Sequence, residues 1–528
     1  MSRDMSRDMS RETFYITCAI DYVNSNPHLG TAYEKIAADA LARYRRMTGA
    51  DVYFLMGTDE HSLNVERAAQ KQGKTPLAYT DEMAARFEAV WKSLDLSYDV
   101  FIRTSEPRHH RAVQALFRRI HERGDIVKGT YRGFYCVGCE AFKQEKELVD
   151  GLCPVHRSKP DWIEEENWFF RLSAYQEPLL EHFRRHPDFL VPQSRRNEIL
   201  NLIESGLDDI SVSRPGSGWG VPLPIDPSQR VYVWFDALIN YITAAGFGVS
   251  EPGEEARFAH WWPASLHVIG KDITRFHAVI WPAMLLAAGL PLPRQILGHG
   301  WVTFRGERLS KSLGNIVAPL EVTAAYGPDP LRFYLLKEVP LDRDGDFSWD
   351  LFIQRYNTEL ANELGNLVSR TVTLAVRSFE GMMPAVYAPA SSGPDAELER
   401  TARAAIENYR TAFEQHAVDE AIAAVWTLIR RANQYIEETA PWNLAKDPGA
   451  GDRLATVLNG LLESVRLIAL LLSPIMPGKC AEIRLRLRAS ADAANLSLED
   501  ARWDPLAYRS LQALVRPEPL FPRIDAKA

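Results

Sequence analysis

Three short stretches of this sequence combine residue types and spacings that could perform chemistry. The first is Pro27-His28-Leu29-Gly30-Thr31, predicted to lie where a strand gives way to a helix. A helix N-terminus at the carboxyl edge of a parallel sheet offers N–H groups and a positive dipole end to phosphates. A histidine there can donate a hydrogen bond to phosphate, and a nearby glycine lets a flat base approach the backbone. The stretch predicts a nucleotide site; the alternative is a purely structural histidine.

The second stretch runs from Arg308 to Asn315, with the letters RLSKSLGN, and follows a predicted strand and turn. It places the cations Arg308 and Lys311 beside the hydroxyls of Ser310 and Ser312. Such a loop suits a polyphosphate, because the negative charge that develops on a leaving pyrophosphate must be met by cations. The alternative is a basic loop that only contacts solvent.

The third stretch is a pair of metal-ligand spacings. Cys136 and Cys139 form one CxxC pair, and Cys153 and His156 form a second pair after 13 intervening residues. Two such knuckles can close a tetrahedron around Zn²⁺. All four positions would come from the protein, so no coordination site is left for catalysis. The spacing therefore predicts one structural zinc; the alternative is a set of buried thiols.

The first two stretches together resemble the HIGH and KMSKS signatures of class I aminoacyl-tRNA synthetases, in the same order and on the same predicted elements. Thr31 stands at the second histidine of HIGH, and Arg308 at the first lysine of KMSKS. From Phe14 to the C-terminus, the sequence is similar to the methionyl-tRNA synthetase family. The stretches that carry this similarity are Tyr22-Val-Asn-Ser-Asn-Pro-His-Leu-Gly, Gly57-Thr-Asp-Glu-His61, Tyr232-Val-Trp-Phe-Asp-Ala237, Gly270-Lys-Asp-Ile273 and Phe276-His277.

The resemblance implies an activity. It is the ATP-dependent ligation of methionine to tRNA(Met) through methionyl-adenylate, with release of AMP and pyrophosphate and with Mg²⁺ accompanying ATP. The implied catalytic residues are His28, Thr31, Arg308 and Lys311. The implied ATP-binding residues are His28, Gly30, Gly270, Asp272, Lys311 and Ser312.

The resemblance also implies a methionine site. Its residues would be Ala19, Ile20, Asp59, Trp234, Ala237, Leu238, Tyr241, Ile273 and His277. The chemistry fits, because a thioether packs well against aromatic and apolar side chains. Asp59 would pair with the substrate ammonium, and Tyr241 and His277 would offer polar hydrogens near the sulfur. Without the resemblance, an aromatic stripe of this kind is typical of an ordinary core.

The implied partner of the C-terminal half is tRNA(Met), including the initiator tRNA. Asn366 and Arg370 are four residues apart and so share a helix face. In the family, these positions and Trp442, within Ala440-Pro441-Trp442, read the anticodon by hydrogen bonds and by stacking on a splayed base. Read without the resemblance, they would be a solvated face and a core tryptophan.

The elements that must position these residues follow from the hydrophobic pattern. Residues 14–20 and 51–56 are predicted strands on either side of a helix that starts at Leu29, and this order predicts a parallel sheet. A second block repeats the order with a strand at 265–269, a helix at 274–288 and a strand at 295–304. Residues 129–142 lack a helical period and read as an insertion. After about residue 355, apolar stripes at helical spacing predict a bundle.

The fold class is therefore α/β, a split Rossmann-like parallel sheet with a zinc-knuckle insertion, followed by an all-α anticodon-binding bundle. The predicted parts are a disordered tail (1–11), the first Rossmann half (12–120), the zinc-knuckle insertion (121–229), the second half with the RLSKS loop (230–326), a linker that contacts the tRNA stem (327–357), the bundle (358–512) and a C-terminal tail (513–528).

Bulk composition narrows the class of protein. The 528 residues are 46% hydrophobic and 25% charged, which is ordinary for a globular protein, and the net charge of −8 confines any tRNA contact to local basic patches. No apolar run reaches the roughly 18 residues of a membrane span. Five cysteines without a disulfide-like pattern favour a reducing cytoplasm. The short sequence after 520-LFP-522 favours a monomer.

Two alternatives remain open at this point. The chain could be a class I synthetase for another amino acid, although the interval from His28 to Lys311 has little room for the editing insertion of the isoleucine, valine and leucine enzymes. A cysteine enzyme would bind its substrate through zinc, which four protein ligands would prevent. The second alternative is a non-catalytic RNA-binding paralogue, against which His28, Asp59 and Lys311 speak.

Overall fold

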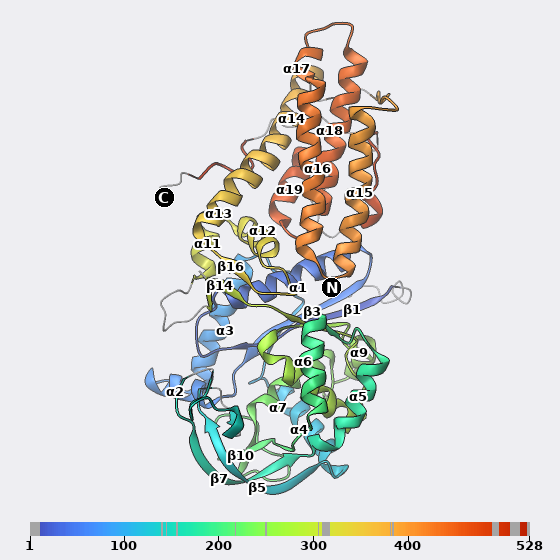
Figure 1. Ribbon diagram of the computed structural model, residues 1–528. Coiled ribbons are helices and arrows are strands. Elements are labelled where there is room, and N and C mark those ends of the chain that lie inside the picture. The colour runs from blue at the N-terminus through green and yellow to red at the C-terminus, as the bar shows by residue number, and fades with distance from the viewer. Residues whose placement is uncertain are drawn as a thin grey trace. The chain divides into compact units, whose positions relative to one another are not determined.

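The structure is a computed structural model that describes residues 11–138, 141–143, 145–154, 157–216, 218–248, 251–304, 306–308, 317–380, 382, 385–487, 496–506 and 518–524. The chain forms two compact units (Figure 1). The sheet unit comprises Met1–Pro27, Asp51–Lys92 and Ser97–His299. The helical unit comprises His28–Ala50, Ser93–Leu96 and Gly300–Ala528.

Among the described residues, the sheet unit is built on a seven-stranded parallel sheet. Its strands are β1 (Thr13–Cys18), β2 (Asp21–Tyr22), β3 (Asp51–Asp59), β4 (Val100–Arg103), β8 (Leu190–Val191), β12 (Leu266–Gly270) and β13 (Ile296–His299). The order is β2-β3-β1-β12-β13-β8, with β4 also paired to β3, so β1 lies between β3 and β12. Parallel strands covered on both faces must be apolar throughout, and residues 14–18 of β1 are all buried.

The predicted insertion is also a sheet structure. It contains the strands β5 (Ile126–Cys136), β6 (Ala141–Lys143), β7 (Asp161–Phe170) and β9 (Ile210–Ser211), in the order β6-β5-β7-β9, and the separate pair β10 (Ser213–Pro215) and β11 (Gln229–Val231). All of these pairings are antiparallel. The absence of a helical period in this part of the sequence is thus explained by two long strands, β5 and β7, paired along ten residues each.

Helices connect these strands. Those of the sheet unit are α2 (Leu63–Lys71), α3 (Pro76–Ser93), α4 (Pro107–Glu122), α5 (Gln176–Arg185), α6 (Gln193–Glu204), α7 (Val233–Leu238), α8 (Asn240–Ala245), α9 (Glu254–Trp261) and α10 (Trp281–Ala288). Short 3-10 and π segments are η2 (Glu145–Glu147), η3 (Leu172–Tyr175), η4 (Lys271–Ile273) and η5 (Phe276–Ile280). The helix predicted over 274–288 is therefore α-helical at Thr274 and Arg275, continues as a π turn over Phe276–Ile280, and is again an α-helix from Trp281.

The helical unit starts with α1 (Leu29–Met47) and continues after His299. Its further helices are α11 (Pro319–Tyr326), α12 (Pro328–Glu338), α13 (Trp349–Arg355), the π segment η7 (Tyr356–Gly365), α14 (Asn366–Phe379), α15 (Pro394–Glu414), α16 (Val418–Thr439), α17 (Pro441–Leu444), α18 (Gly451–Leu471), α19 (Pro477–Arg486) and the 3-10 turn η9 (Leu498–Asp500). A small sheet joins β15 (Glu307–Arg308), β14 (Val302–Phe304) and β16 (Gly345–Phe347). Helices α14, α15, α16 and α18 run alongside one another as a bundle (Figure 1).

Helix α18 forms the centre of this bundle. In the described part of the chain it is the one helix long and apolar enough to cross a membrane, but 94% of its apolar window is buried against other helices. Its two central charges, Glu463 and Arg466, form a buried ion pair. Apolar residues all round a helix are expected when other helices surround it, so α18 is a core helix.

The strand predicted over 295–304 is wrong as one element. The structure ends β13 at His299 and begins β14 at Val302, and the two strands belong to different sheets. The break falls at Gly300, where a Cβ would lie 2.1 Å from the carbonyl oxygen of Arg343. Only a glycine permits this approach, and a contact so distant along the chain leaves no mark on the local apolar pattern.

Helix α1 is anchored within the helical unit by a buried ion pair. The guanidinium of Arg332, on α12, lies 2.6 Å from the Asp39 carboxylate of α1. It also donates to the carbonyls of Leu94, Pro474 and Ile475. Arg332 and Asp39 are both fully buried, and a buried charge is stable only when its hydrogen-bonding capacity is met. These bonds fix the helix that begins directly after His28.

Candidate active site

Strand ends of the central sheet gather several of the residues predicted to bind methionine. Ala19 and Ile20 directly follow β1, Asp59 is the last residue of β3, and Gly270 is the last residue of β12. These three strands are neighbours and run parallel, so their carboxyl ends lie at one edge of the sheet. This edge is where ligands bind in open α/β sheets. The Asp59 side chain is buried there, at 5% exposure.

The residue after Asp59 is tightly anchored. Glu60 is fully buried, and its carboxylate accepts hydrogen bonds from Arg103, Thr58 and Ser105. Its carbonyl oxygen accepts a hydrogen bond from the indole of Trp219 at 2.5 Å. A carboxylate saturated in this way has no capacity left for a substrate, so Glu60 fixes the backbone beside Asp59.

A cluster of three histidines surrounds the carboxylate of Asp236, on α7. His61 Nδ1 lies 2.7 Å from one Asp236 oxygen, and His109 Nε2 lies 2.8 Å from the other. His110 Nε2 lies 3.2 Å from His61 Nε2. Burial raises the pKa of Asp236, but the two histidine partners outweigh burial and bring the pKa below its usual range. Asp236 therefore carries its charge. Burial and the neighbouring His61 lower the pKa of His110 to about 4.

Tyr241 and His277 form a pair within hydrogen-bond distance. The Tyr241 hydroxyl lies 2.7 Å from His277 Nε2, and His277 Nδ1 lies 3.1 Å from the carbonyl oxygen of Ile273. A carbonyl only accepts, so Nδ1 carries a hydrogen, and Nε2 of the neutral ring accepts from the tyrosine. Of the two polar hydrogens that were expected near the substrate sulfur, the tyrosine hydrogen is thus used within the pair and the histidine hydrogen is donated to Ile273.

A second histidine, His267, packs against the Tyr241 ring. The His267 ring lies 4.4 Å from the Tyr241 ring, centroid to centroid. Trp281 donates its indole N–H to His267 Nε2, so His267 Nδ1 carries the hydrogen and donates to the Thr17 hydroxyl at 2.6 Å. Burial lowers the pKa of His267 well below its ordinary value. This ring is neutral and completely buried, which makes it packing for the site rather than a titrating group.

The aromatic and apolar residues expected around the thioether are also in this unit. The Trp234 ring of α7 stacks on Phe276 with 4.0 Å between centroids and 14° between planes. Ala237 and Leu238, one turn further along α7, are buried. Trp234 is only partly buried, so one part of this aromatic pair remains accessible.

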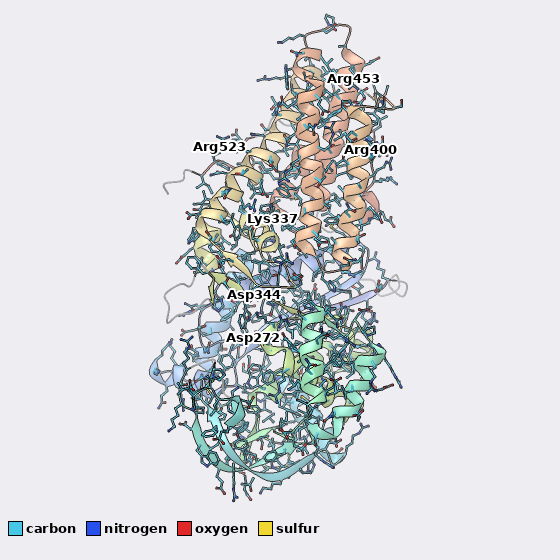
Figure 2. All side chains as sticks on the ribbon, viewed as in Figure 1. Asp272, Lys337, Asp344, Arg400, Arg453 and Arg523 are labelled. Atoms are coloured by element: carbon cyan, nitrogen blue, oxygen red, sulfur yellow. The ribbon has the colours of Figure 1, made fainter. Side chains whose placement is uncertain are left out.

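Gly270 and Asp272 are the residues of this unit that were predicted to bind ATP. Asp272 is exposed (Figure 2). A Cβ on Gly270 would lie 2.7 Å from Asp272 Oδ1, so the carboxylate lies directly over the glycine backbone. A side chain at position 270 would displace the Asp272 carboxylate from this position.

His28 and Thr31 form the N-terminal cap of α1, in the helical unit. His28 Nδ1 accepts a hydrogen bond from the Gly30 amide at 3.1 Å, which places the hydrogen of the neutral ring on Nε2. The Thr31 hydroxyl accepts from the His28 amide at 3.0 Å and donates to the His28 carbonyl at 2.8 Å. This is a capping box. Thr31 therefore holds His28 through its backbone.

The loop predicted to follow the pyrophosphate is described only at its start. The backbone of Arg308 ends β15, where Arg308 pairs with Thr303. Lys311 and Ser312 lie outside the described residues, so their predicted roles rest on the sequence.

The predicted zinc ligands are described in part. Cys136, at the end of β5, and Cys153 are buried thiols, whereas Cys139 and His156 lie outside the described residues. Beside Cys153, Arg157 N–H donates to the Cys153 carbonyl at 2.7 Å, and Cys153 N–H donates to the Ser158 carbonyl at 2.9 Å. Two buried soft donors fit a zinc knuckle.

The structure brings two of the three predicted anticodon residues together. The Arg370 guanidinium lies 5.6 Å from the centre of the Trp442 ring and 2.8 Å from Glu437. Asn366 begins α14, one turn before Arg370, and is exposed. Trp442 is partly exposed on α17. A partly exposed arginine beside a partly exposed tryptophan is a surface on which a base could stack.

Sequence reasoning missed the roles of His61, Asp236, His109 and His110. Two of these residues lie within stretches that carried the family resemblance, but neither was given a function. The hydrogen-bonded partners are 175 and 127 positions apart in the chain, so no local pattern links them. The His109-His110 dipeptide was the available signal, and by itself it does not identify a partner.

Family profiles match nearly the whole chain. The profile described as tRNA synthetases class I (M) matches residues 14–161 and 144–372. The profile described as anticodon binding domain of methionyl tRNA ligase matches residues 387–527. The two matches correspond in order to the sheet-containing part and the bundle.

Individual relatives agree. The chain is 44% identical over 521 residues to the methionine–tRNA ligase of Caldanaerobacter subterraneus subsp. tengcongensis, covering 98% of this chain and 80% of the relative. It is 45% identical over 523 residues to that of Thermosynechococcus vestitus, covering 97% of each chain. Among solved structures, it is similar to Mycobacterium tuberculosis methionyl-tRNA synthetase in complex with methionyl-adenylate. The TM-score is 0.90 at 41% identity, over 97% of this chain and 100% of the other.

Proposed function

This chain belongs to the methionyl-tRNA synthetase family, and from that premise we propose how its residues ligate methionine to tRNA(Met) with ATP. The observation that supports the assignment of residues is that Asp59 ends β3 at the carboxyl edge of the parallel sheet, with Trp234 and the Tyr241–His277 pair in the same unit. A buried carboxylate near an aromatic and apolar wall matches an amino acid with a cationic ammonium and a thioether side chain.

The first step is adenylation. A methionine carboxylate oxygen attacks the α-phosphorus of ATP in line, the bond to the bridging oxygen breaks, and pyrophosphate leaves with the electron pair. No side chain must transfer a proton, because the nucleophile is already a carboxylate. Positioning and charge stabilisation then account for the rate. Mg²⁺ accompanies ATP as its counter-ion.

Each nucleotide contact is assigned to a residue of this chain. His28, whose Nδ1 accepts from Gly30, directs its Nε2–H to a phosphate oxygen, and Thr31 holds the His28 backbone. Gly270 and Asp272 bind the nucleoside, since the bare glycine backbone admits a flat or sugar ring. On the loop, Arg308, Lys311 and Ser312 contact the leaving pyrophosphate.

The methionine contacts are assigned to residues of the same site. Asp59 accepts from the ammonium, and Trp234 packs against the thioether. Tyr241, oriented by its hydrogen bond to His277, contacts the sulfur. The remaining wall residues are Ala19, Ile20, Ala237, Leu238 and Ile273.

The second step transfers methionine to tRNA. The 2′ hydroxyl of the terminal adenosine attacks the adenylate carbonyl, its proton passes to the departing AMP phosphate, and the ester is formed. Asn366, Arg370 and Trp442 select the anticodon of tRNA(Met), including the initiator tRNA, by base-edge bonds and by stacking.

A zinc ion bound by Cys136, Cys139, Cys153 and His156 would be structural. The buried thiols at 136 and 153 support this assignment. Metal analysis of the purified protein should find about one zinc per chain. Cys139→Ala should lose the metal and destabilise the insertion before it affects ATP binding; full stability without metal would contradict the proposal.

The assembly and location are proposals as well. We expect one chain per particle in the cytoplasm, as the sequence predicts. Light scattering at micromolar concentration should give the mass of one chain, 59.7 kDa, and a stable dimer would contradict this.

The decisive experiment for the function is ATP–pyrophosphate exchange across a panel of amino acids. Methionine alone should support exchange at low concentration. Exchange with another amino acid would identify a different synthetase, and no exchange at all with intact tRNA binding would identify a non-catalytic RNA-binding protein.

A further inference from the structure

The carboxylate of Asp236 lies between two elements that carry the proposed methionine contacts. Asp236 belongs to α7, together with Trp234, Ala237 and Leu238. Its partner His61 follows Asp59 by two residues, just beyond the end of β3. The hydrogen bond from His61 to Asp236 therefore joins the loop of the ammonium partner to the helix of the thioether wall.

We propose that Asp236 is a positioning residue for methionine, which acts through His61 and His109 to fix the distance between Asp59 and Trp234. This inference rests on the proposed methionine roles of Asp59 and Trp234, and it adds a group that touches neither substrate nor nucleotide.

The placement of Asp236 on its helix supports this role. Successive residues of an α-helix are rotated by about 100°, so Trp234 and Asp236, two positions apart, face nearly opposite directions. Asp236 is completely buried, whereas Trp234 is partly accessible. The helix has only six residues, and a helix that short has no stability of its own. Its rotation must therefore be fixed by tertiary bonds, and the Asp236 carboxylate supplies two of them.

The second histidine fixes α7 from another side. His109, on α4, binds the second Asp236 oxygen, and its Nδ1 lies 3.3 Å from the Thr243 hydroxyl of α8. The Thr243 hydroxyl donates its own hydrogen to the Ile239 carbonyl at 2.9 Å. Thus α4, α7 and α8 are tied together around one carboxylate. Because α8 also carries Tyr241, this network reaches each side of the proposed methionine site.

The loop side of the network is equally constrained. The His61 ring contacts Trp219 edge-on at 5.3 Å and His110 at 4.9 Å, centroid to centroid. Glu60, between Asp59 and His61, is held by Arg103, so the backbone of this loop has little freedom to move. Loss of the Asp236 bond would release α7 rather than the loop, so the aromatic wall should shift relative to the ammonium partner.

The test is methionine-dependent ATP–pyrophosphate exchange by the full chain. Asp236→Asn keeps the volume but places an amide N–H₂ opposite a histidine N–H, so one of the two bonds is lost. A misplacement of the wall by a fraction of an ångström should raise the methionine KM by roughly 10- to 100-fold. The ATP KM should stay close to that of the wild type, whereas the melting temperature should fall, because one buried hydrogen bond is lost.

Two histidine variants make the test specific. His61→Asn retains an N–H in the place of Nδ1, whereas His61→Leu removes it. The methionine KM should rise in His61→Leu and be largely restored in His61→Asn. This comparison also tests the positioning role of Asp236 if the Asp236→Asn variant does not fold.

A matched control comes from the bundle. Asp395 is likewise buried and accepts hydrogen bonds from Arg453 and Tyr435. Asp395→Asn should lower the melting temperature without changing the methionine KM. An equal rise in KM for this control would reduce the Asp236 effect to general destabilisation and overturn the inference.

The outcomes separate this inference from the proposed function. If the wild-type protein shows no methionine-dependent exchange, the proposed function fails. If the wild type exchanges methionine but folded Asp236→Asn retains its methionine KM, or if His61→Leu and His61→Asn behave alike, only the positioning role of Asp236 is overturned.

Discussion

The residues proposed to bind methionine and those proposed to bind the anticodon differ in how firmly the surrounding protein holds their side chains. Asp59, Tyr241 and His277 are buried, and their neighbours bind one another through carboxylates and imidazoles that have almost no exposure. Arg370 and Trp442 are partly exposed and make a cation–π contact with each other, and Arg370 also forms an exposed ion pair with Glu437. A small substrate that is recognised by a few atoms demands side chains held in fixed positions, whereas a large flexible RNA can bring its own base to a partly exposed surface.

This contrast predicts which reaction each class of variant will affect. Variants on the methionine and phosphate side should impair adenylation, which can be measured without tRNA. Variants on the anticodon surface should impair only aminoacylation.

Lys311→Ala should give the largest effect. Lys311 meets charge that develops only as the bond to pyrophosphate breaks, so its contact strengthens in the transition state. The adenylation rate should fall by roughly 100-fold or more, about 3 kcal/mol, with little change in methionine affinity. Arg308→Ala should cost less, since Arg308 is the position that departs from the family signature. Pre-steady-state pyrophosphate release at saturating substrates measures both, and an unchanged rate in Lys311→Ala would remove it from the mechanism.

Trp442→Ala should have the next largest effect, which is on tRNA binding, and should leave adenylation intact. Loss of one base stack costs about 1–3 kcal/mol of tRNA binding. Trp442→Phe retains a stacking face and should recover part of that loss. Comparison of tRNA KM in aminoacylation with the exchange rate is the measurement. An equal fall in both reactions would show that Trp442 supports folding instead, and would break the contrast.

His416→Asn tests whether acid sensitivity is confined to the histidine-rich sheet unit. Burial, followed by the nearby Arg45, lowers the pKa of His416 to about 4. Below its unfolded pKa of about 6.5, the unfolded chain takes up a proton that the folded chain refuses, so stability falls as pH drops from 6.5 toward 4. The loss should reach about 1–2 kcal/mol at pH 5. Asparagine tolerates the positive φ of 59° at this position.

The thermal unfolding of wild type and His416→Asn at pH 7 and pH 5 checks this expectation. The variant should lose less stability between the two pH values. Equal losses would show that His416 does not contribute to acid unfolding.

Arg370→Ala should have the smallest effect on stability. Its ion pair with Glu437 is exposed, and such pairs are worth about 0–1 kcal/mol. Aminoacylation should nevertheless weaken, because the variant removes a group from the proposed anticodon surface. Arg400→Ala is the matched control, an exposed ion-paired arginine of α15 (Figure 2), and should alter neither stability nor aminoacylation. A large drop in melting temperature for Arg370→Ala would contradict the expected surface role.

The sequence alone predicted the helices and strands whose formation depends on neighbouring residues in the chain. The strand ending near Asp59, the helix starting at Leu29 and the bundle stripes all follow from apolar periodicity, and the structure confirms them. Of the residues predicted from family stretches, Ala19, Ile20, Asp59 and Gly270 lie at or directly after the carboxyl ends of three neighbouring strands, and their roles stay a prediction.

Long-range contacts account for what the sequence did not reveal. The partners of Asp236 lie 175 and 127 positions away, and the break at Gly300 depends on the carbonyl of Arg343. The capping box at His28 shows a third case, in which a side chain at Thr31 that departs from the family signature has a local structural role.

Helix α18 has a consequence for how this protein is made. An all-round apolar helix is hazardous whenever it is exposed, because it can associate with other unfolded chains or with lipid. Four of its packing partners, α14, α15, α16 and α17, precede it in the sequence and leave the ribosome first, whereas α19 follows it. When α18 emerges, most of its cover is therefore already made, and the order of elements along the chain limits the time for which this apolar helix is exposed.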